Sequence, residues 1–182
     1  MVEPTDEELM THFTQGNEQA FDTLFARRAP QLHSFLGGLV REPALAEDLL
    51  QTTFLSMVRS RDRWRPGSKV APWLFSIAAN AARDALRHRS RWQGDEDALA
   101  ALPSPVSAEA KDPALARRLE TALSHLPLQQ REAVVLHHVL DWSFEEMAAA
   151  LGANATTMRV RAHRGFAKLR ELLDDLRPAK EG

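Results

Sequence analysis

Apolar residues recur at intervals of three and four along most of the chain, the spacing that gives a helix one buried face. No stretch of useful length alternates between apolar and polar residues, so the pattern predicts helices and no strands. Thr5 and Glu8 form a capping box that begins a first helix, which is expected to end near Gly16. Asn17 can cap a second helix, and Pro30 is expected to kink it because proline lacks an amide donor.

Two further helices are predicted in the N-terminal half. Pro43 fits the first turn of one of them, and Pro72 begins the other, which runs to about Trp92. Between them, Ser60–Val70 contains a Pro-Gly pair and is predicted to be a loop.

The helical pattern stops between Gln93 and Asp112, where acidic residues and prolines accumulate. This segment is predicted to be an acidic, partly extended linker of roughly twenty residues, longer than compact single domains usually contain. Beyond it, helices are expected over Ala114–His125 and Leu128–Leu140, separated by Leu126-Pro127. The predicted fold is therefore all-α, with small helical bundles at residues 1–93 and 114–182 and a linker at 94–113.

The segment Asp141–Arg170 has the pattern of a helix-turn-helix. Ser143 and Glu146 form a second capping box, which predicts a short helix that ends at Gly152, the residue that turns most easily. Asn154 can cap another helix directly after that turn.

The second helix of this segment has two contrasting faces when it is drawn at about 100° per residue. Its apolar arc carries Met158, Ala162, Gly165, Phe166 and Leu169. Its opposite arc and flanks carry Arg159, Val160, Arg161, His163, Arg164 and Lys168. No acidic residue occurs from Asn154 to Arg170, and this combination is typical of a helix that reads the DNA major groove. The alternative is an ordinary helical hairpin with a solvated basic face.

Composition narrows the class of protein. At 182 residues with 44% hydrophobic and 26% charged residues, the chain can build cores. The absence of cysteine excludes disulfides and thiolate metal sites. Met1–Gln15 is acidic and lacks an apolar signal core, and no apolar run is long enough to span a membrane, so a cytoplasmic protein is expected. The net charge of −2 is low for a chain that binds DNA alone, which favours a larger partner.

The helix that begins at Pro43 has a mixed outer stripe of Asp48, Gln51, Thr52 and Leu55. Polar and apolar residues side by side on an exposed helix suit contact with a partner helix. Plain solvated surface is an equally good explanation of the stripe alone.

Cationic residues surround an aromatic residue in the Ser60–Val70 loop. Trp64 lies among Arg59, Arg61, Arg63, Arg65 and Lys69. This pattern suits single-stranded nucleic acid, because cations follow phosphates while a ring stacks on a base at roughly 1–3 kcal/mol per base. The next helix adds one polar face with Asn80, Arg83, Asp84, Arg87 and Arg91. An asparagine can read a base edge and arginines can hold phosphates. The alternative places Trp64 in the core beneath an ordinary basic surface.

Enzyme chemistry is not predicted. Adjacent helical residues such as His137 and His138 diverge by about 100° and cannot easily share a metal ion. The sequence contains no phosphate-cradling glycine loop and no nucleophile with an obvious base. No cofactor and no metal site are therefore expected.

Several segments of the chain resemble those of a known protein family. Gly16–Phe21, AEDLLQTTFLSM at 46–57 and WLFSIAANAARDALRHRSR at 73–91 are similar to the second domain of bacterial sigma factors. Residues 122–173 are similar to their fourth domain. With little else present, the chain resembles the small extracytoplasmic-function (ECF) group of sigma factors, which are dissociable specificity subunits of RNA polymerase and not enzymes.

The resemblance implies a role for each segment. The helix with Asp48, Leu49, Gln51, Thr52 and Leu55 would bind the clamp helices of the largest polymerase subunit, and the chain would also contact the flap region. Recognition and opening of the minus-ten element would use Arg61, Arg63, Trp64, Arg65, Lys69, Trp73, Asn80, Arg83, Arg87 and Arg91. Reading of the minus-thirty-five element would use Thr157, Arg159, Val160, Arg161, His163, Arg164 and Lys168. The acidic linker would lie toward the RNA exit path, and an anti-sigma factor is the implied regulator.

The recognition helix departs from the family pattern at Thr156, Val160 and Phe166, where a glycine, a small polar residue and a basic residue are common. These changes leave the preferred upstream sequence open.

Two rival functions follow from the residues. One is a one-component helix-turn-helix regulator that acts as a dimer without core polymerase, although no exposed heptad seam is visible for a dimer. The other is a helical metal-dependent hydrolase that uses His33, His125, His137 or His138.

Overall fold

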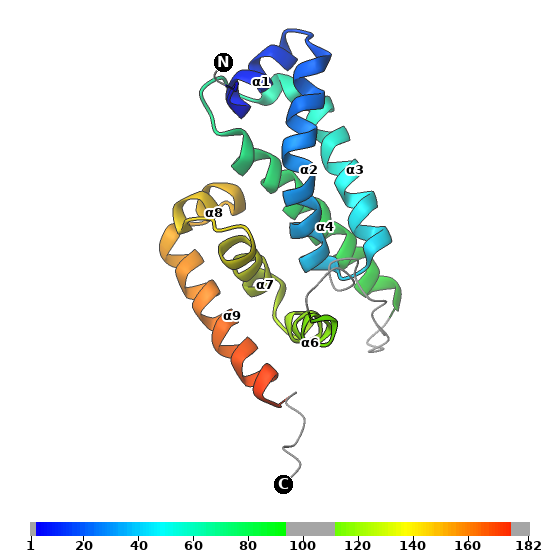
Figure 1. Cartoon of the computed structure of the whole chain (residues 1–182), viewed down its shortest axis with the longest axis vertical. Helices are drawn as coiled ribbons and strands as arrows, with labels where there is room; N and C mark the ends of the chain where they lie inside the picture. Colours follow the sequence, from blue (N-terminus) through cyan, green and yellow to red (C-terminus); the bar gives the residue numbers. More distant parts are fainter. Residues whose placement is uncertain (1–2, 94–111, 176–182) are drawn as a thin grey trace.

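The computed structural model describes residues 3–93 and 112–175, and Figure 1 shows their arrangement. The described residues are helical with no strand, which confirms the all-α prediction. The first bundle contains α1 (Asp6–Thr14), α2 (Glu18–Val40), α3 (Pro43–Arg59), a 3-10 turn (Arg61–Arg63) and α4 (Val70–Gln93). The second bundle contains α6 (Pro113–Ser124), α7 (Leu128–Val134), a π-helical turn (Val135–Val139), α8 (Phe144–Leu151) and α9 (Ala155–Asp175).

The helices begin where the capping pattern predicts. The Thr5 and Glu8 capping box is complete at α1, and the Asn17 Oδ1 atom accepts the Ala20 amide at α2. Hydrogen bonds from Thr5 hold the pKa of Glu8 below its usual value. Pro43 occupies the first turn of α3, as predicted. Local hydrogen bonds of this kind form within four residues, which is why the sequence pattern predicts them.

As predicted, α2 contains Pro30 and resumes beyond it to Val40. Other helix boundaries differ from the prediction. The helix α4 begins at Val70, before Pro72, and α6 begins at Pro113 with Asp112 as its cap. Most of the predicted linker, at 94–111, lies outside the described residues.

The helix predicted over Leu128–Leu140 is α-helical only to Val134, and a π-helical turn ends it. The wider turn brings the Trp142 amide within 3.0 Å of the Leu136 carbonyl, which accepts its hydrogen bond. Turns of this kind are rare and often occur at functional sites.

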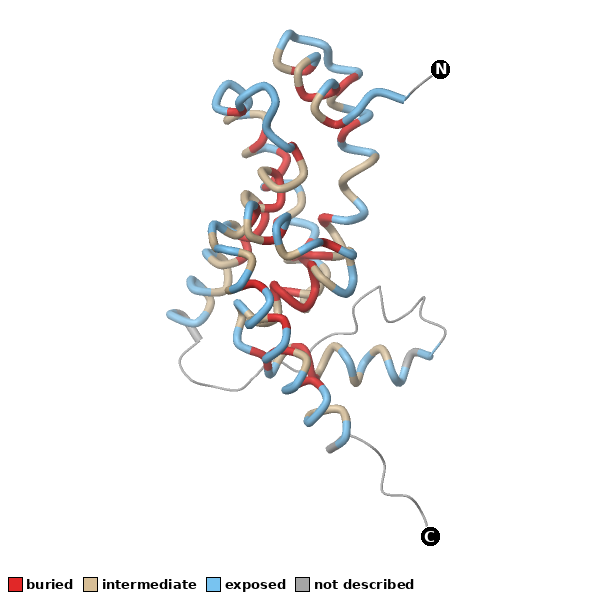
Figure 2. The backbone as a smooth tube through the Cα atoms, turned by 90° about the vertical axis from the view of Figure 1, so that its left-hand side faces the viewer, coloured by how far each residue is buried: buried red, intermediate tan, exposed pale blue. Residues whose placement is uncertain are grey.

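The two bundles pack against each other across one shared apolar core. In Figure 1, α7 and α8 lie against α2 and α4, and Figure 2 shows buried positions gathered on the inward sides of the helices. The rings of Phe75 and Trp142, one from each bundle, have centroids 4.6 Å apart. A Cβ atom at Gly38 would lie 2.9 Å from a methyl carbon of Val135, so the glycine permits the close approach of α2.

A smaller core lies entirely within the second bundle. It is formed by Ala122, Leu123, Leu126, Val134 and Leu169. This core holds α6 on α7 and α9, and so positions the helix-turn-helix.

Candidate nucleic-acid interface

The helix-turn-helix is built as its sequence predicts. The Ser143 and Glu146 capping box is complete, and α8 ends at Gly152 with φ of 65°, the left-handed conformation that favours glycine. The Asn154 Oδ1 atom accepts the Thr157 amide at 2.7 Å, so Asn154 caps α9. A Cβ atom at Gly165 would lie 2.6 Å from a Val134 methyl carbon, so α9 passes directly over α7.

The two faces of α9 also follow the prediction. Met158, Ala162 and Leu169 are buried. The outward face consists of exposed Arg159, Val160, His163 and Arg164, with Lys168 exposed and Arg161 partly buried at the flank. This leaves a face with several cationic groups and the apolar Val160, which is 42% exposed.

Contacts within the second bundle orient part of this face. The Arg159 guanidinium lies 5.2 Å from the centroid of the Phe144 ring, a cation–π contact that links α9 to α8. Phe166 is partly buried, with its ring centroid 3.8 Å from that of His138, so this residue supports the helix from behind. Burial of His138 lowers its pKa, and His137 lowers it further.

On α4, the predicted minus-ten face is only partly free. Asn80, Arg87 and Arg91 are exposed. Arg83 donates to both carboxylate oxygens of Glu132 on α7, at 2.7 and 2.8 Å, and to the Asn80 Oδ1 atom at 3.2 Å. Arg83 is thus held by the second bundle in this conformation.

In the Ser60–Val70 loop, the cationic side chains of Arg61, Arg63, Arg65 and Lys69 are exposed. Trp64 is only 5% exposed and belongs to the core, so the prediction that its ring offers a stacking face is wrong for this conformation. Burial of the ring is favourable because it removes apolar surface from water, and the buried ring anchors the loop to the core. Trp73 is partly buried.

The outer stripe of α3 is exposed as predicted at Asp48, Gln51, Thr52 and Leu55. Leu55 is 55% exposed, so it offers an apolar contact beside the polar residues of the stripe. Leu49 is only 6% exposed, so its inclusion in the partner-binding set is wrong: it packs in the core of the first bundle.

Part of the predicted minus-ten face and part of the predicted minus-thirty-five face line one hollow of about 670 Å³, formed by α4, the start of α7 and α9. Its cationic lining residues are Arg83, Arg87, Arg161 and Arg164. Thr157 and Val160 line it too.

Sequence reasoning missed Glu132, which is fully buried on α7. The available signal was a carboxylate among the apolar residues of an amphipathic helix, which requires a partner when buried. The partner, Arg83, is 49 residues away and could not be named from spacing.

The histidines do not form a metal site within the described part of the chain. Among residues 3–93 and 112–175, no group of three or more histidine or acidic side chains could hold a metal ion. His137 instead forms a 2.8 Å hydrogen bond with the Trp142 carbonyl. In the same described ranges, no helix has the length and apolar character that crossing a bilayer needs.

Comparison with known proteins defines the class. Residues 24–91 match the model of Sigma-70 region 2, and residues 116–169 match that of Sigma-70, region 4. The chain is 51% identical over 170 residues to the RNA polymerase sigma factor CarQ of Myxococcus xanthus, covering 92% of this chain and 97% of that protein. It is 35% identical over 187 residues to the ECF RNA polymerase sigma factor SigE of Mycolicibacterium smegmatis, covering 94% and 70% of the two chains.

Solved structures agree with this assignment. The sigma factor RpoE in complex with the anti-sigma factor NepR from Bartonella quintana matches with a TM-score of 0.73 and 29% identity, over 86% of this chain and 98% of that one. CnrH in complex with the cytosolic domain of CnrY matches with a TM-score of 0.76 and 26% identity, over 94% and 99% of the two chains.

The chain therefore belongs to the sigma-70 family of RNA polymerase sigma factors. Within that family it is an ECF-type sigma factor, a transcription initiation factor. The comparisons give no support to the rival prediction of a one-component regulator.

Proposed function

We propose that the chain directs core RNA polymerase to promoters by dividing the task among three surfaces. The observation that carries this proposal is the outward face of α9, where exposed Arg159, His163 and Arg164 project from a capped helix-turn-helix whose sequence has no acidic residue from 154 to 170. Such a face attracts phosphate and reads base edges in the major groove. It would bind the minus-thirty-five element, with Val160 in apolar contact with a base.

Core polymerase is proposed to bind the outer stripe of α3. Asp48 offers a charge and Leu55 an apolar contact on the same exposed face, with Gln51 and Thr52 between them. Clamp helices of the largest polymerase subunit are the proposed partner, and the flap region is the proposed partner of the second bundle.

The minus-ten element is proposed to meet the Ser60–Val70 loop and α4. The exposed Arg63, Arg65 and Lys69 would hold phosphates, while Asn80 would read an unpaired base. Trp64 would serve as the buried support of this loop and not as a stacking platform.

Promoter binding at both faces requires the bundles to separate. The major groove of B-form DNA is about 12 Å wide, and a helix that enters it must have space beside it for the rest of the duplex. The hollow of about 670 Å³ between α4 and α9 has no room for that. The described arrangement is thus proposed to be the closed form, which opens on core polymerase.

An anti-sigma factor is the proposed regulator, since related sigma factors have been solved in complex with NepR and CnrY. We also propose that the chain is cytoplasmic and that catalysis belongs entirely to the polymerase.

Reconstitution with core polymerase tests the whole proposal. The chain should convert core enzyme into a form that starts transcription at a defined set of promoters, mapped by sequencing of RNA 5′ ends. Start sites that are identical with and without the chain would overturn it.

A further inference from the structure

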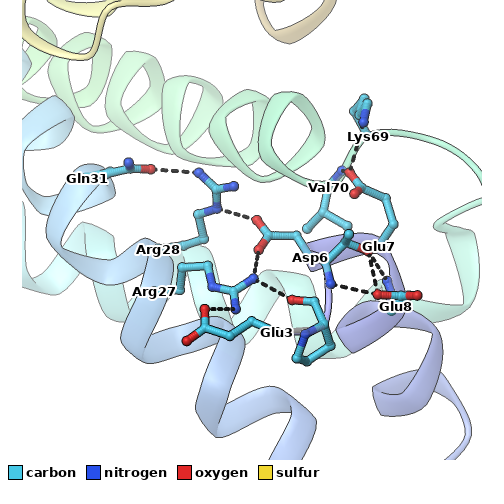
Figure 3. Close-up of polar contacts among 11 residues, drawn as sticks. Glu3, Asp6, Glu7, Glu8, Arg27, Arg28, Gln31, Lys69 and Val70 are labelled. Atoms are coloured by element: carbon cyan, nitrogen blue, oxygen red, sulfur yellow. Dashed lines mark hydrogen bonds and ion pairs between the residues drawn. The ribbon is translucent and has the colours of Figure 1, made fainter. Parts of the chain in front are cut away.

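The first helix, α1, ends outside the matched sigma region, which begins at residue 24, yet it contacts the loop proposed to open DNA. The Glu7 Oε1 atom of α1 accepts the Val70 backbone amide at 3.1 Å. The same oxygen lies 4.0 Å from the Lys69 ammonium. Figure 3 shows both contacts: Glu7 points away from its own helix toward the junction of loop and α4.

Val70 is the first residue of α4, so Glu7 supplies the helix with a cap from 63 residues away. The first amides of a helix have no partner within it, and a carboxylate at this end is favourable because of the helix dipole. Pro72, in the same first turn of α4, has no backbone N–H that could donate a hydrogen bond. The carboxylate of Glu7 therefore stabilises the start of α4 at its junction with the loop.

The helix α1 is itself fixed to α2. Asp6 is buried, and its carboxylate accepts hydrogen bonds from Arg27 at 2.8 Å and from Arg28. The Arg27 guanidinium also donates to the Pro4 carbonyl at 2.9 Å. Two neighbouring residues of α1 thus have different partners: Asp6 binds the arginines of α2, while Glu7 binds the end of the loop (Figure 3).

The second half of the loop, residues 65–69, is consequently held at both ends. Trp64 is buried in the core before it, and Glu7 binds Val70 after it. Only the exposed residues 65–69 lie between these two points. They include Arg65 and Lys69, which are proposed to hold promoter phosphates.

A second carboxylate also lies near Lys69. Glu146 of α8 lines the same hollow as Glu7 and Lys69. Hydrogen bonds from Ser143 lower the pKa of Glu146 most, and the Lys69 charge lowers it further. Glu146 belongs to the second bundle and would leave when the bundles separate. Glu7 belongs to the first bundle, so its contact would persist in the open form.

We propose that Glu7 is a positioning residue for promoter melting, which holds the start of α4 and the Ser60–Val70 loop in the geometry that receives unpaired DNA. This inference rests on the proposed minus-ten role of that loop. Misplacing such a surface by about 1 Å can cost orders of magnitude in a step that depends on orientation.

The test compares three variants in reconstituted holoenzyme. Glu7→Ala should lower permanganate reactivity of promoter thymines roughly tenfold, the size expected when one charge-assisted hydrogen bond is lost. Binding to core polymerase and to closed duplex should stay within about twofold, because neither surface is touched. A premelted, mismatched template should restore transcription. Glu7→Gln keeps an acceptor oxygen for Val70 and should retain most of the melting activity.

Glu8→Ala is the matched control. Glu8 accepts from Thr5, the cap of α1, and forms no hydrogen bond or ion pair with Lys69 or Val70 among the described residues, so its loss weakens the helix alone. Hydrogen exchange of the Val70 amide should speed up in Glu7→Ala and stay unchanged in Glu8→Ala.

Equal melting by Glu7→Ala and the parent, or an equal loss in Glu8→Ala, would overturn the positioning role while leaving the sigma function intact. Failure of the parent chain itself to open any promoter would instead remove the proposed function, and this inference with it.

Discussion

Arg83 and Glu132 form a two-pronged ion pair between the first and second bundles, with nitrogen–oxygen distances of 2.7 and 2.8 Å. The Glu132 side chain is fully buried, while 26% of the Arg83 side chain remains exposed. Glu132 therefore occupies the guanidinium of Arg83, which is proposed to bind promoter DNA, and a phosphate cannot bind Arg83 while the pair is formed. Removing one member of a buried pair is costly because the other charge stays behind.

Glu132→Gln should shift the chain toward separated bundles, because Arg83 can be hydrated and has lost its charged partner. We expect a larger radius of gyration by small-angle X-ray scattering and tighter binding of a promoter fragment by the free chain. Glu145→Gln removes a charge from the exposed surface of α8 and is the control. An unchanged radius of gyration and unchanged DNA affinity in Glu132→Gln would show that the ion pair does not hold the closed form.

Asp48→Arg should abolish capture of core polymerase while preserving the fold. Asp48 is exposed on the outer stripe of α3, and surface substitutions usually change the free energy of unfolding by less than about 0.5 kcal/mol. Pull-down of core enzyme and the thermal midpoint are the measurements. Glu47→Arg makes the same charge change about 100° around the helix and should bind normally. Undiminished capture by Asp48→Arg would refute the assigned surface.

Arg164→Ala should weaken binding of the upstream promoter element by roughly 1–3 kcal/mol and relax the preference at one base if Arg164 reads a base edge. A uniform loss over all sequences would identify a phosphate contact instead. Fluorescence anisotropy against a set of single-base variants distinguishes the two. Arg170→Ala, beyond the proposed reading residues on the same helix, is the control. Intact promoter affinity at physiological salt after alanine replaces both Arg159 and Arg164 would exclude this face.

Asn80→Ala should impair melting more than binding. Asn80 is exposed on α4, and duplex affinity rests on phosphate contacts and α9. Unstacking a base costs a few kcal/mol and requires a site that receives it. Permanganate reactivity of unpaired thymines and transcription should fall, and a premelted template should recover most of the loss. A variant that opens duplex promoters like the parent would reduce Asn80 to a surface residue.

Ser143→Ala should cost about 1 kcal/mol of stability at neutral pH, because it removes the cap of α8. Hydrogen bonds from Ser143 lower the pKa of Glu146 below its ordinary value of 4.5. The folded state then binds fewer protons than the unfolded state, so this contribution is complete above that value and fades as the pH falls below it. Urea unfolding at several pH values should show a smaller acid dependence in the variant. Parallel pH profiles for parent and variant would exclude the linkage.

Local patterns in the sequence were enough to predict most helices and the faces of α9. The capping box at Ser143, the turn at Gly152 and the cap at Asn154 all depend on atoms within a few residues of one another. Helical periodicity likewise separates buried Met158 from exposed Arg159 without knowledge of any other segment. Family resemblance then assigned these elements to a sigma factor.

Only the tertiary structure decided which residues of these surfaces are available. The sequence and the family resemblance assigned Trp64 and Leu49 to binding surfaces, but long-range packing places both residues in the core. Arg83 pairs with Glu132, which is 49 residues away in the chain. Val70 pairs with Glu7, which is 63 residues away. Such pairings depend on how whole helices cross, and spacing along the sequence carries no record of that geometry. The closed arrangement of the two bundles follows from the same long-range contacts, because apolar surface from both is buried in one core.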